Sequence, residues 1–314
     1  MTGLDVGLNL ATAGGRTGGL DPGALSREAV WAEEQGFGSV WVGDHVVHHG
    51  PILDAVVAAT VASTVTTRVR IGIGVLLLAL RGLVVPAKQL SSLAALSGGR
   101  LTVGVGVGGE FPAEWAACGV PTAGRGARTD GYLPPFAALL AGEPVEYHGG
   151  ALDFGPVRLD PPAPVPIPIL GSGRAERALR RAATLTDGWL GFLQTPAGVA
   201  RAVDAMGAWR AASPRAGRPF TVGMLLPYRI DDEPAGAARR AAELLAAGHG
   251  GATAELFERF VVAGPPDAVL EGLRSLAGAG CSLLVVNPAD ADPAARRRQL
   301  ERFAAEVLPR LTDA

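Results

Sequence analysis

The sequence predicts an α/β protein of the (β/α)₈ TIM-barrel class, with an insertion before the fifth strand. Three observations support this prediction. Eight short apolar segments alternate with longer helical patterns along the chain, which is the order of a closed parallel barrel. A length of 314 residues suits a barrel of about 250 residues that carries insertions. Residues 143–168 interrupt the alternation with a run rich in proline and glycine.

The first half of the chain contains four strand–helix units. Its strands are expected at Asp5–Leu10, Gly38–Val42, Val69–Leu77 and Leu101–Val107. Its helices are expected at Pro22–Gln35, Leu53–Thr64, Val84–Leu96 and Arg125–Ala141. Pro134 and Pro135 are expected to bend or interrupt the last helix, because proline lacks a backbone N–H donor.

The second half continues the alternation after the insertion. Its strands are expected at Pro166–Leu170, Gly188–Phe192, Phe220–Leu226 and Ser282–Asn287. Its helices are expected at Ala175–Leu185, Ala197–Ala211, Pro234–Ala247, Glu255–Val262, Pro266–Ala277 and Pro293–Leu308. We interpret residues 143–168 as an insertion in one α/β unit, so residues 1–314 form a single domain. A doubly wound open sheet is the alternative, but no early strand-to-helix turn carries a clean dinucleotide fingerprint.

The composition fits an enzyme rather than a disordered chain. Apolar residues make up 48% and charged residues 18% of the chain, as in ordinary globular proteins. The net charge of −2 gives no sign of a nucleic-acid partner. Cys118 and Cys281 are too few for a disulfide framework, so we expect a cytoplasmic protein. The first ten residues lack a signal-peptide pattern, and the longest apolar stretch, Val75–Leu80, is too short to span a membrane.

The end of the second strand carries an Asp-His pair. In a barrel the functional residues lie in the loops that follow the strands, so Asp44 and His45 are expected at the mouth. Histidine titrates near neutral pH and can act as an acid, a base or a hydrogen-bond donor. The alternative is structural, with Asp44 capping a turn and His45 partly buried. His48 and His49 follow, but their spacing does not indicate a metal site, and none is predicted.

Glycines and one carboxylate distinguish the third and fourth strands. Gly74 lies inside the third strand, where glycine marks a bulge, a close ligand approach or simple packing. Gly106 and Gly108 end the fourth strand, and their missing side chains would let the backbone approach a flat ring or a phosphate. Glu110 follows in the loop as a candidate acid or base. Glu114, one turn later, is interpreted as a solvated residue.

The fifth strand ends in a turn that suits a phosphate. Gly171, Ser172, Gly173 and Arg174 lie directly before a predicted helix. Small residues at a helix start leave backbone N–H groups available, and the helix dipole favours an anion there. The alternative is an ordinary tight connection that Ser172 caps.

Several segments together resemble the bacterial luciferase-like flavin and deazaflavin oxidoreductases. They are GFGSVWVGDH, TTRVRIGIGVLLL, PAKQLSSLAALSGGRLTVGVGVGGE, ILGSGRAERALRRAATLTDGWL and VAGPPDAVLEGLRSLAGAG. The resemblance extends over nearly the whole chain. It implies a barrel, often a homodimer, with a flavin or deazaflavin ring bound at the mouth.

The resemblance also implies a role for individual residues. A non-prolyl cis peptide in the third strand would support the ring, and the matching bond is Gly74–Val75. The cofactor phosphate would lie at Gly171–Arg174. Asp44 and His45 match the pair of the deazaflavin-dependent members, where the histidine lies beside the reactive ring. Glu110 matches a proton donor of some members, subject to one residue of register.

Three functions remain open from the sequence. The first is hydride transfer with coenzyme F420, favoured by Asp44-His45 and the GGEFPAEW segment. The second is an FMN-dependent monooxygenase that receives reduced FMN from a partner flavin reductase. The third is a barrel that binds a cofactor without turnover. Five aromatic side chains are expected to form an apolar substrate pocket: Phe111, Trp115, Trp189, Phe192 and Tyr228.

Overall fold

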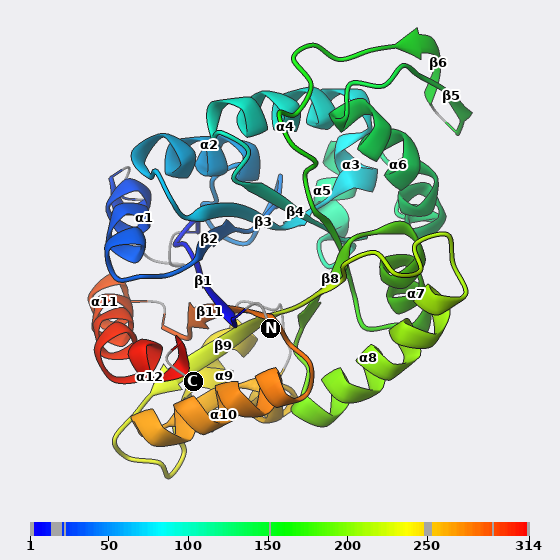
Figure 1. The fold of residues 1–314 in the computed structure, drawn as a ribbon. Helices are drawn as coiled ribbons and strands as arrows, with labels where there is room; N and C mark the ends of the chain where they lie inside the picture. The colour runs from blue at the N-terminus through cyan, green and yellow to red at the C-terminus, as the bar shows by residue number, and fades with distance from the viewer. Residues whose placement is uncertain are drawn as a thin grey trace.

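The computed structural model describes residues 3–13, 21, 23–150, 152–247, 253–290 and 292–312. A closed barrel of eight parallel strands forms its centre, as predicted (Figure 1). The barrel strands are β1 (Asp5–Asn9), β2 (Ser39–Val42), β3 (Arg70–Leu76), β4 (Leu101–Val105), β7 (Ile169–Ser172), β8 (Gly188–Phe192), β9 (Thr221–Ile230) and β11 (Leu283–Pro288). β9 closes the ring because it pairs with both β8 and β11.

Helices surround the barrel on its outer face (Figure 1). The principal ones are α1 (Ala24–Glu34), α2 (Ala55–Val65), α4 (Val84–Leu96), α6 (Arg125–Leu140), α7 (Glu176–Leu185), α8 (Pro196–Ala211), α9 (Ala237–Ala247), α10 (Pro266–Gly278) and α11 (Pro293–Arg302). A π-helical segment (Phe303–Val307) and α12 (Leu308–Thr312) follow α11. Most bounds match the sequence prediction within a few residues, although the expected first residue of α1, Pro22, lies outside the described residues.

Two clusters of apolar side chains pack against the barrel strands. The main core lies between the barrel and its helices. A second cluster combines residues of several strands: Trp41, Leu170, Leu190, Leu283 and Val285. Gly72 makes room for this cluster, because a Cβ there would lie 2.1 Å from the Trp41 ring. Packing therefore explains this glycine.

The predicted insertion is a hairpin that lies outside the ring of helices (Figure 1). β5 (Val145–Gly149) pairs antiparallel with β6 (Leu152–Val157). The Tyr147 ring of the hairpin meets the Tyr132 ring of α6 edge-on, with 5.6 Å between the ring centres. The extra residues are thus attached to α6 and leave the barrel unchanged.

Two sequence expectations about helices are corrected by the structure. Pro134 and Pro135 do not interrupt α6, because buried Leu133 and Phe136 on either side hold it against the core despite the missing N–H donors. Residues 255–262 do not form one helix. They form two 3₁₀ turns, Ala254–Leu256 and Glu258–Phe260, before a short strand, β10 (Val262–Gly264), that extends the sheet beside the end of β9.

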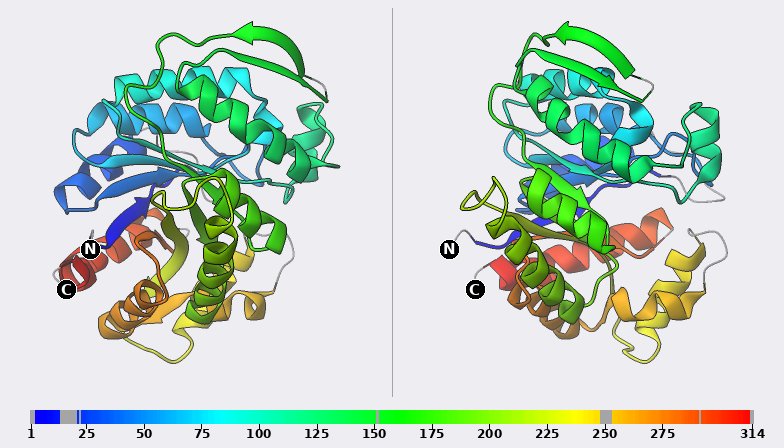
Figure 2. Two further views of the ribbon diagram at one scale, coloured as in Figure 1. Left: turned by 45° about the vertical axis from the view of Figure 1, so that its right-hand side comes forward. Right: turned by 90° about the vertical axis from the view of Figure 1, so that its right-hand side faces the viewer.

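Loop segments build the barrel mouth on the side away from the two chain ends. The right-hand view of Figure 2 shows the short helix α5 (Pro112–Ala117) and α9 on that side, above and below the mouth. Another short helix, α3 (Leu78–Arg81), follows shortly after β3. The sequence prediction did not include α3 or α5, because four to six residues are too few to show a helical period.

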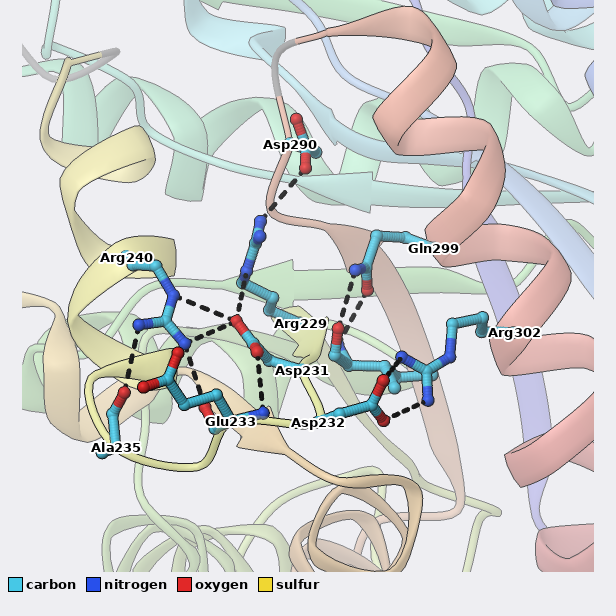
Figure 3. A network of polar contacts seen from close by, with 10 residues as sticks. Arg229, Asp231, Asp232, Glu233, Ala235, Arg240, Asp290, Gln299 and Arg302 are labelled. Carbon is cyan, nitrogen blue, oxygen red and sulfur yellow. Dashed lines mark hydrogen bonds and ion pairs between the residues drawn. The ribbon is translucent and has the colours of Figure 1, made fainter.

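A network of arginines and carboxylates fixes the rim at β9 and β11 (Figure 3). Arg229, at the end of β9, bonds Asp231 at 3.4 Å and Asp290 at 3.1 Å. Arg240 of α9 donates to the same Asp231 carboxylate. The buried Gln299 of α11 donates to the Ile230 carbonyl and accepts from its N–H group. This rim is therefore held by several elements at once.

Candidate active site

The third strand breaks its pairing at the predicted bulge. The Gly74–Val75 peptide is cis, which confirms that prediction, and the register of β3 against β4 shifts between Ile73 and Leu76. Val42, at the end of β2, pairs with Ile73. The bulge and the loop after β2 therefore lie at the same end of two adjacent strands.

An apolar floor lies beside the bulge. Val75 and Leu225 are partly exposed and pack against the Trp41 cluster below them. A Cβ on Gly104 would lie 2.8 Å from Val75, and a Cβ on Gly106 only 2.4 Å from it. The missing side chains of these two glycines therefore leave the space that the Val75 side chain occupies. Direct contact of Gly106 with a cofactor stays a prediction.

Gly108 has a comparable packing function. Its φ angle is +56°, and a Cβ there would lie 2.9 Å from Leu77. The Arg125 Nε atom donates to the Gly108 carbonyl at 3.0 Å. The start of α6 is thus tied to the end of β4, a contact that the sequence analysis missed because the two residues are far apart in the chain.

Asp44 is fully buried and joins the loop after β2 to α3. Its carboxylate accepts from the Leu77 N–H at 2.9 Å and from Nε and Nη2 of Arg81 at 2.8 and 2.5 Å. Arg81 also bonds Asp54 at 2.6 Å. Burial alone would lower the Arg81 pKa, but the bonds to both carboxylates raise it above its ordinary value. With no exposed carboxylate surface, Asp44 acts on its surroundings through Arg81 and the backbone.

His45 is held by a carboxylate from α5. Its Nδ1 atom lies 3.3 Å from Oε1 of Glu114, and the other Glu114 oxygen accepts from the Val46 N–H at 3.1 Å. The His45 side chain is 22% exposed, whereas that of Glu114 is 0% exposed. The interpretation of Glu114 as solvated was therefore wrong, because His45 and the Val46 amide provide partners that the sequence does not show.

Trp115 anchors the helix that carries Glu114. It is buried with Leu77 and Leu80 in a small apolar cluster. Asp44 accepts from the Leu77 N–H, and Glu114 contacts His45. Because Leu77 and Trp115 belong to the same apolar cluster, the partners of Asp44 and His45 are themselves packed together. Glu110 lies before α5 with an exposed side chain. Its catalytic role stays a prediction.

The Gly171–Arg174 turn leads from β7 towards α7. Gly173 has a φ angle of +122°, and a Cβ there would lie 2.7 Å from the Ala178 Cβ. The Gly171 N–H donates to the Thr186 hydroxyl at 3.1 Å, so this donor is already used. Ser172 is half-buried and Arg174 is exposed. The Ala178 and Leu179 N–H groups already donate to the Ala175 carbonyl at 2.8 and 3.1 Å. The N–H groups of Glu176 and Arg177 precede these bonds at the start of the helix, which leaves them for an anion.

Most of the expected aromatic pocket lies in the core. Trp115, Trp189 and Tyr228 are at most 1% exposed, because Trp189 Nε1 donates to the Gly173 carbonyl and the Tyr228 hydroxyl donates to the Gln299 carbonyl. That expectation was wrong for these three residues. Phe111 does lie at the site, with its ring centre 4.8 Å from that of His45.

The described ranges contain no group of three or more His, Cys, Asp or Glu side chains arranged to hold a metal ion. His48 and His49 instead lie against Phe111, with ring centres 5.0 and 4.6 Å away. Within those same ranges, none of the helices has the length and apolar character needed to cross a membrane.

Comparison with known proteins gives consistent relatives. A protein of Mycobacterium tuberculosis with no assigned function is 40% identical over 140 residues, which cover 45% of this chain and 48% of that protein. The match thus spans about half the length of that relative. The 5,10-methylenetetrahydromethanopterin reductase of Methanolobus tindarius is 28% identical over 247 residues, covering 79% of this chain and 70% of the reductase.

Solved structures show the same fold. An F420-dependent secondary alcohol dehydrogenase superposes with a TM-score of 0.83 at 17% identity, covering 98% of this chain and 99% of the other. The FMN-bound oxygenating component of the Pseudomonas putida 3,6-diketocamphane monooxygenase gives 0.75 at 18% identity, with 98% of both chains covered. The profile of the luciferase-like monooxygenase family matches residues 6–283. The chain therefore belongs to the luciferase-like monooxygenase family.

Proposed function

We propose that this chain is an oxidoreductase that binds coenzyme F420 at the barrel mouth and acts on a small organic substrate. The observation that carries the proposal is the position of His45. Its ring is fixed by Glu114 at 3.3 Å in the loop that leaves β2, and the Gly74–Val75 bulge lies at the same end of the neighbouring strand. When bound, the cofactor would supply hydride transfer to or from the substrate.

The residues present fit a flat cofactor with a phosphate. Val75 and Leu225 provide an apolar surface for one ring face, and both are partly exposed. The Gly171–Arg174 turn and the first turn of α7 provide backbone donors, a helix end and the exposed Arg174 for the phosphate. We propose that Ser172, Gly173 and Arg174 contact this phosphate and that Gly171 shapes the turn.

His45 is proposed as the residue that holds or moves a proton beside the ring. We propose that Nδ1 donates to the Glu114 carboxylate, 3.3 Å away, which leaves Nε2 for the cofactor or the substrate. The 22% exposure of the side chain lets it reach the mouth. Asp44 positions this loop through Arg81, and Glu110 remains a second candidate for proton transfer.

The choice between F420 and FMN needs a direct measurement. The F420-dependent alcohol dehydrogenase and the FMN-bound monooxygenase share this fold, so the fold fits both. We favour F420 because of the Asp44-His45 pair. Titration of the purified protein with each cofactor, followed by fluorescence, decides the matter. Tight binding of FMN alone would instead support a monooxygenase that depends on a flavin reductase, and binding without any substrate-linked redox change would support a non-catalytic barrel.

The His45→Asn variant tests the proton-transfer role. General acid–base assistance contributes about 10²–10⁴-fold in rate, so single-turnover rates should fall by at least about 10²-fold at saturating cofactor. Cofactor affinity and the melting temperature should stay close to those of the parent. A single-turnover rate within a few-fold of the parent would remove His45 from this role, and Glu110 would be tested next.

We also propose that the protein acts in the cytoplasm, in line with its two cysteines, and that it forms a homodimer, as the family resemblance implies. Valine and leucine side chains on the outer faces of α2 and α4 support this proposal: Val57 is 59%, Val85 66% and Leu96 70% exposed. Light scattering during size-exclusion chromatography should give twice the mass of 32.0 kDa. A Val85→Glu/Leu96→Glu variant should then elute as a monomer with an unchanged melting profile at low concentration.

A further inference from the structure

A pocket lined by three arginines lies beside the proposed phosphate turn. Its volume is about 290 Å³. Arg174 comes from the turn after β7, Arg201 from α8, and Arg259 from the 3₁₀ turn Glu258–Phe260. Gln194 and Thr195, which follow β8, line it as well. Elements far apart in the chain therefore bring three positive charges to one hollow.

The described residues supply no carboxylate partner for these charges. Within the part of the chain that the structure describes, no carboxylate lies within 4.0 Å of the guanidinium groups of Arg174, Arg201 or Arg259, and none lines the pocket. The arginines of the β9 rim differ, because Arg229 and Arg240 share Asp231. The pocket is thus suited to an anion from outside the protein.

The start of α8 adds to the positive potential. Thr195 caps this helix of 16 residues by accepting from the Gly198 N–H at 3.2 Å, and both residues line the pocket. The N-terminal end of a helix carries partial positive charge. Guanidinium groups bind carboxylates and phosphates through paired N–H donors, so both chemistries suit the site.

Arg174 connects this pocket to the proposed cofactor site. It ends the Gly171–Arg174 turn and also lines the pocket. An anionic group bound in the pocket could therefore belong to the same ligand as the phosphate, in the part of the ligand that follows the phosphate. FMN ends at its phosphate, whereas coenzyme F420 continues into a chain of glutamate residues that carries several carboxylates.

We infer that Arg201 and Arg259, which line the pocket beside Arg174 at the phosphate turn, bind the carboxylates of the chain that follows the cofactor phosphate. This inference rests on the proposed use of F420. A second pocket of about 270 Å³ adjoins the first and shares Gln194, Arg259 and Phe260 with it. Its walls include Val262 and Leu276, which provide room and apolar surface for the methylene groups of such a chain.

The test compares cofactor forms and arginine variants of the full chain. Affinities are measured by fluorescence titration for F420 with its glutamate chain, for the same cofactor without glutamates, and for FMN. The variants are Arg201→Gln, Arg259→Gln and the double variant. Arg298→Gln is the matched control, because Arg298 is an exposed residue of α11 that does not line the pocket.

Exposed ion pairs contribute modestly, so each single variant should weaken binding of the glutamate-bearing form about two- to fivefold. The double variant should weaken it about tenfold. The form without glutamates should bind all variants equally, and high salt should reduce the difference between the two forms in the parent. Melting temperatures and the Arg298→Gln affinities should match the parent.

Two results would overturn the inference while leaving the proposed function intact. One is an equal loss for both cofactor forms, which would place the arginines at the phosphate. The other is no loss for either form, including the case in which only the KM of a carboxylate-bearing substrate changes. If the parent binds FMN but neither deazaflavin form, the proposed function has failed and the inference fails with it.

Discussion

The Nδ1 atom of His45 lies 3.3 Å from Oε1 of Glu114, a carboxylate that is 69 residues further along the chain and wholly buried. The second Glu114 oxygen accepts from the Val46 N–H, so one carboxylate fixes both the ring and the backbone of the loop after β2. This arrangement restrains the orientation of the His45 ring. It makes Glu114 a positioning residue whose effect can be separated from that of His45 itself.

Glu114→Gln should reduce turnover without reducing cofactor affinity. Glutamine keeps an acceptor for the Val46 N–H, but its neutral amide no longer fixes the proton on Nδ1 of His45. We expect turnover to fall by about 10²-fold, the lower end of the range for a positioned acid or base, and the pH profile of kcat to shift. Steady-state rates across pH and a cofactor titration measure both effects.

Glu110→Gln compares the second candidate for proton transfer with Glu114. Glu110 is exposed, whereas Glu114 is buried against His45, so we expect the substitution at Glu110 to lower turnover less than the substitution at Glu114. If Glu110→Gln lowers turnover more than Glu114→Gln does, Glu110 is the proton-transfer group and Glu114 serves the fold.

Asp44→Asn should destabilise the protein by about 3 kcal/mol, as expected when a buried ion pair loses one partner. The substitution weakens a bidentate bond to Arg81, whose side chain is only 13% exposed. Chemical unfolding monitored by circular dichroism measures the change. Asp54→Asn is the comparison, because Asp54 bonds the same arginine but is 39% exposed.

Asparagine caps a helix about as well as aspartate, so Asp54→Asn should preserve the bonds to Val56 and Val57 at the start of α2. The cost of that variant should stay below about 1 kcal/mol. Equal losses in the free energy of unfolding for the two variants would show that the buried Asp44–Arg81 pair stabilises the fold no more than the exposed Asp54–Arg81 pair.

The fold was predictable from the sequence because each barrel strand is a short apolar run that turn residues delimit. Both ends of α4 and of β8 match the prediction. The hairpin at Val145–Val157 was predicted only as an insertion, because its residues alternate exposed and half-buried against α6 rather than forming an apolar run. The prolines of α6 misled the prediction because local propensity was outweighed by burial of the neighbouring side chains.

Only those site residues that form a short pattern of neighbours in the sequence could be predicted. The cis bond at Gly74–Val75 followed from the family resemblance, and the Asp44-His45 pair from its place after a strand. The partners of those residues were missed. Glu114 and Arg81 reach them from other elements, and no spacing in the sequence links residues that only tertiary packing brings together.

Gly173→Val should weaken binding of the cofactor by at least about tenfold while the barrel stays folded. The residue has a φ angle of +122°, and a side chain there would meet Ala178. A β-branched residue must therefore move the turn, at a cost of about 1–3 kcal/mol. Fluorescence titration and thermal melting measure the two effects.

Gly155→Val provides the control, since Gly155 lies in the hairpin and a Cβ there meets no atom within 4 Å. Its cofactor affinity should equal that of the parent. An unchanged affinity in Gly173→Val would reject the placement of the phosphate at this turn.

Glu33 should make a pH-dependent contribution to stability. Burial opposes its ionisation, but the N–H groups of Val69, Arg68 and Thr67 donate to its carboxylate and lower its pKa from the ordinary 4.5 to about 2. A carboxylate with a lowered folded-state pKa stabilises fully above its unfolded pKa, and this stability is lost as pH falls through the folded value. Glu33→Gln should therefore be less stable than the parent at about pH 7, and the gap should narrow between pH 4.5 and about pH 2.

Chemical unfolding of both proteins at several pH values in this window measures the gap directly. Glu34→Gln is the control, because Glu34 is the exposed neighbour on the same helix, and its stability should follow that of the parent at every pH. The three N–H groups belong to the turn that leads into β3. The Glu33 carboxylate that accepts from them therefore fixes the start of that strand. A gap between parent and Glu33→Gln that stays constant down to about pH 2 would mean that the variant loses packing rather than an ionised acceptor.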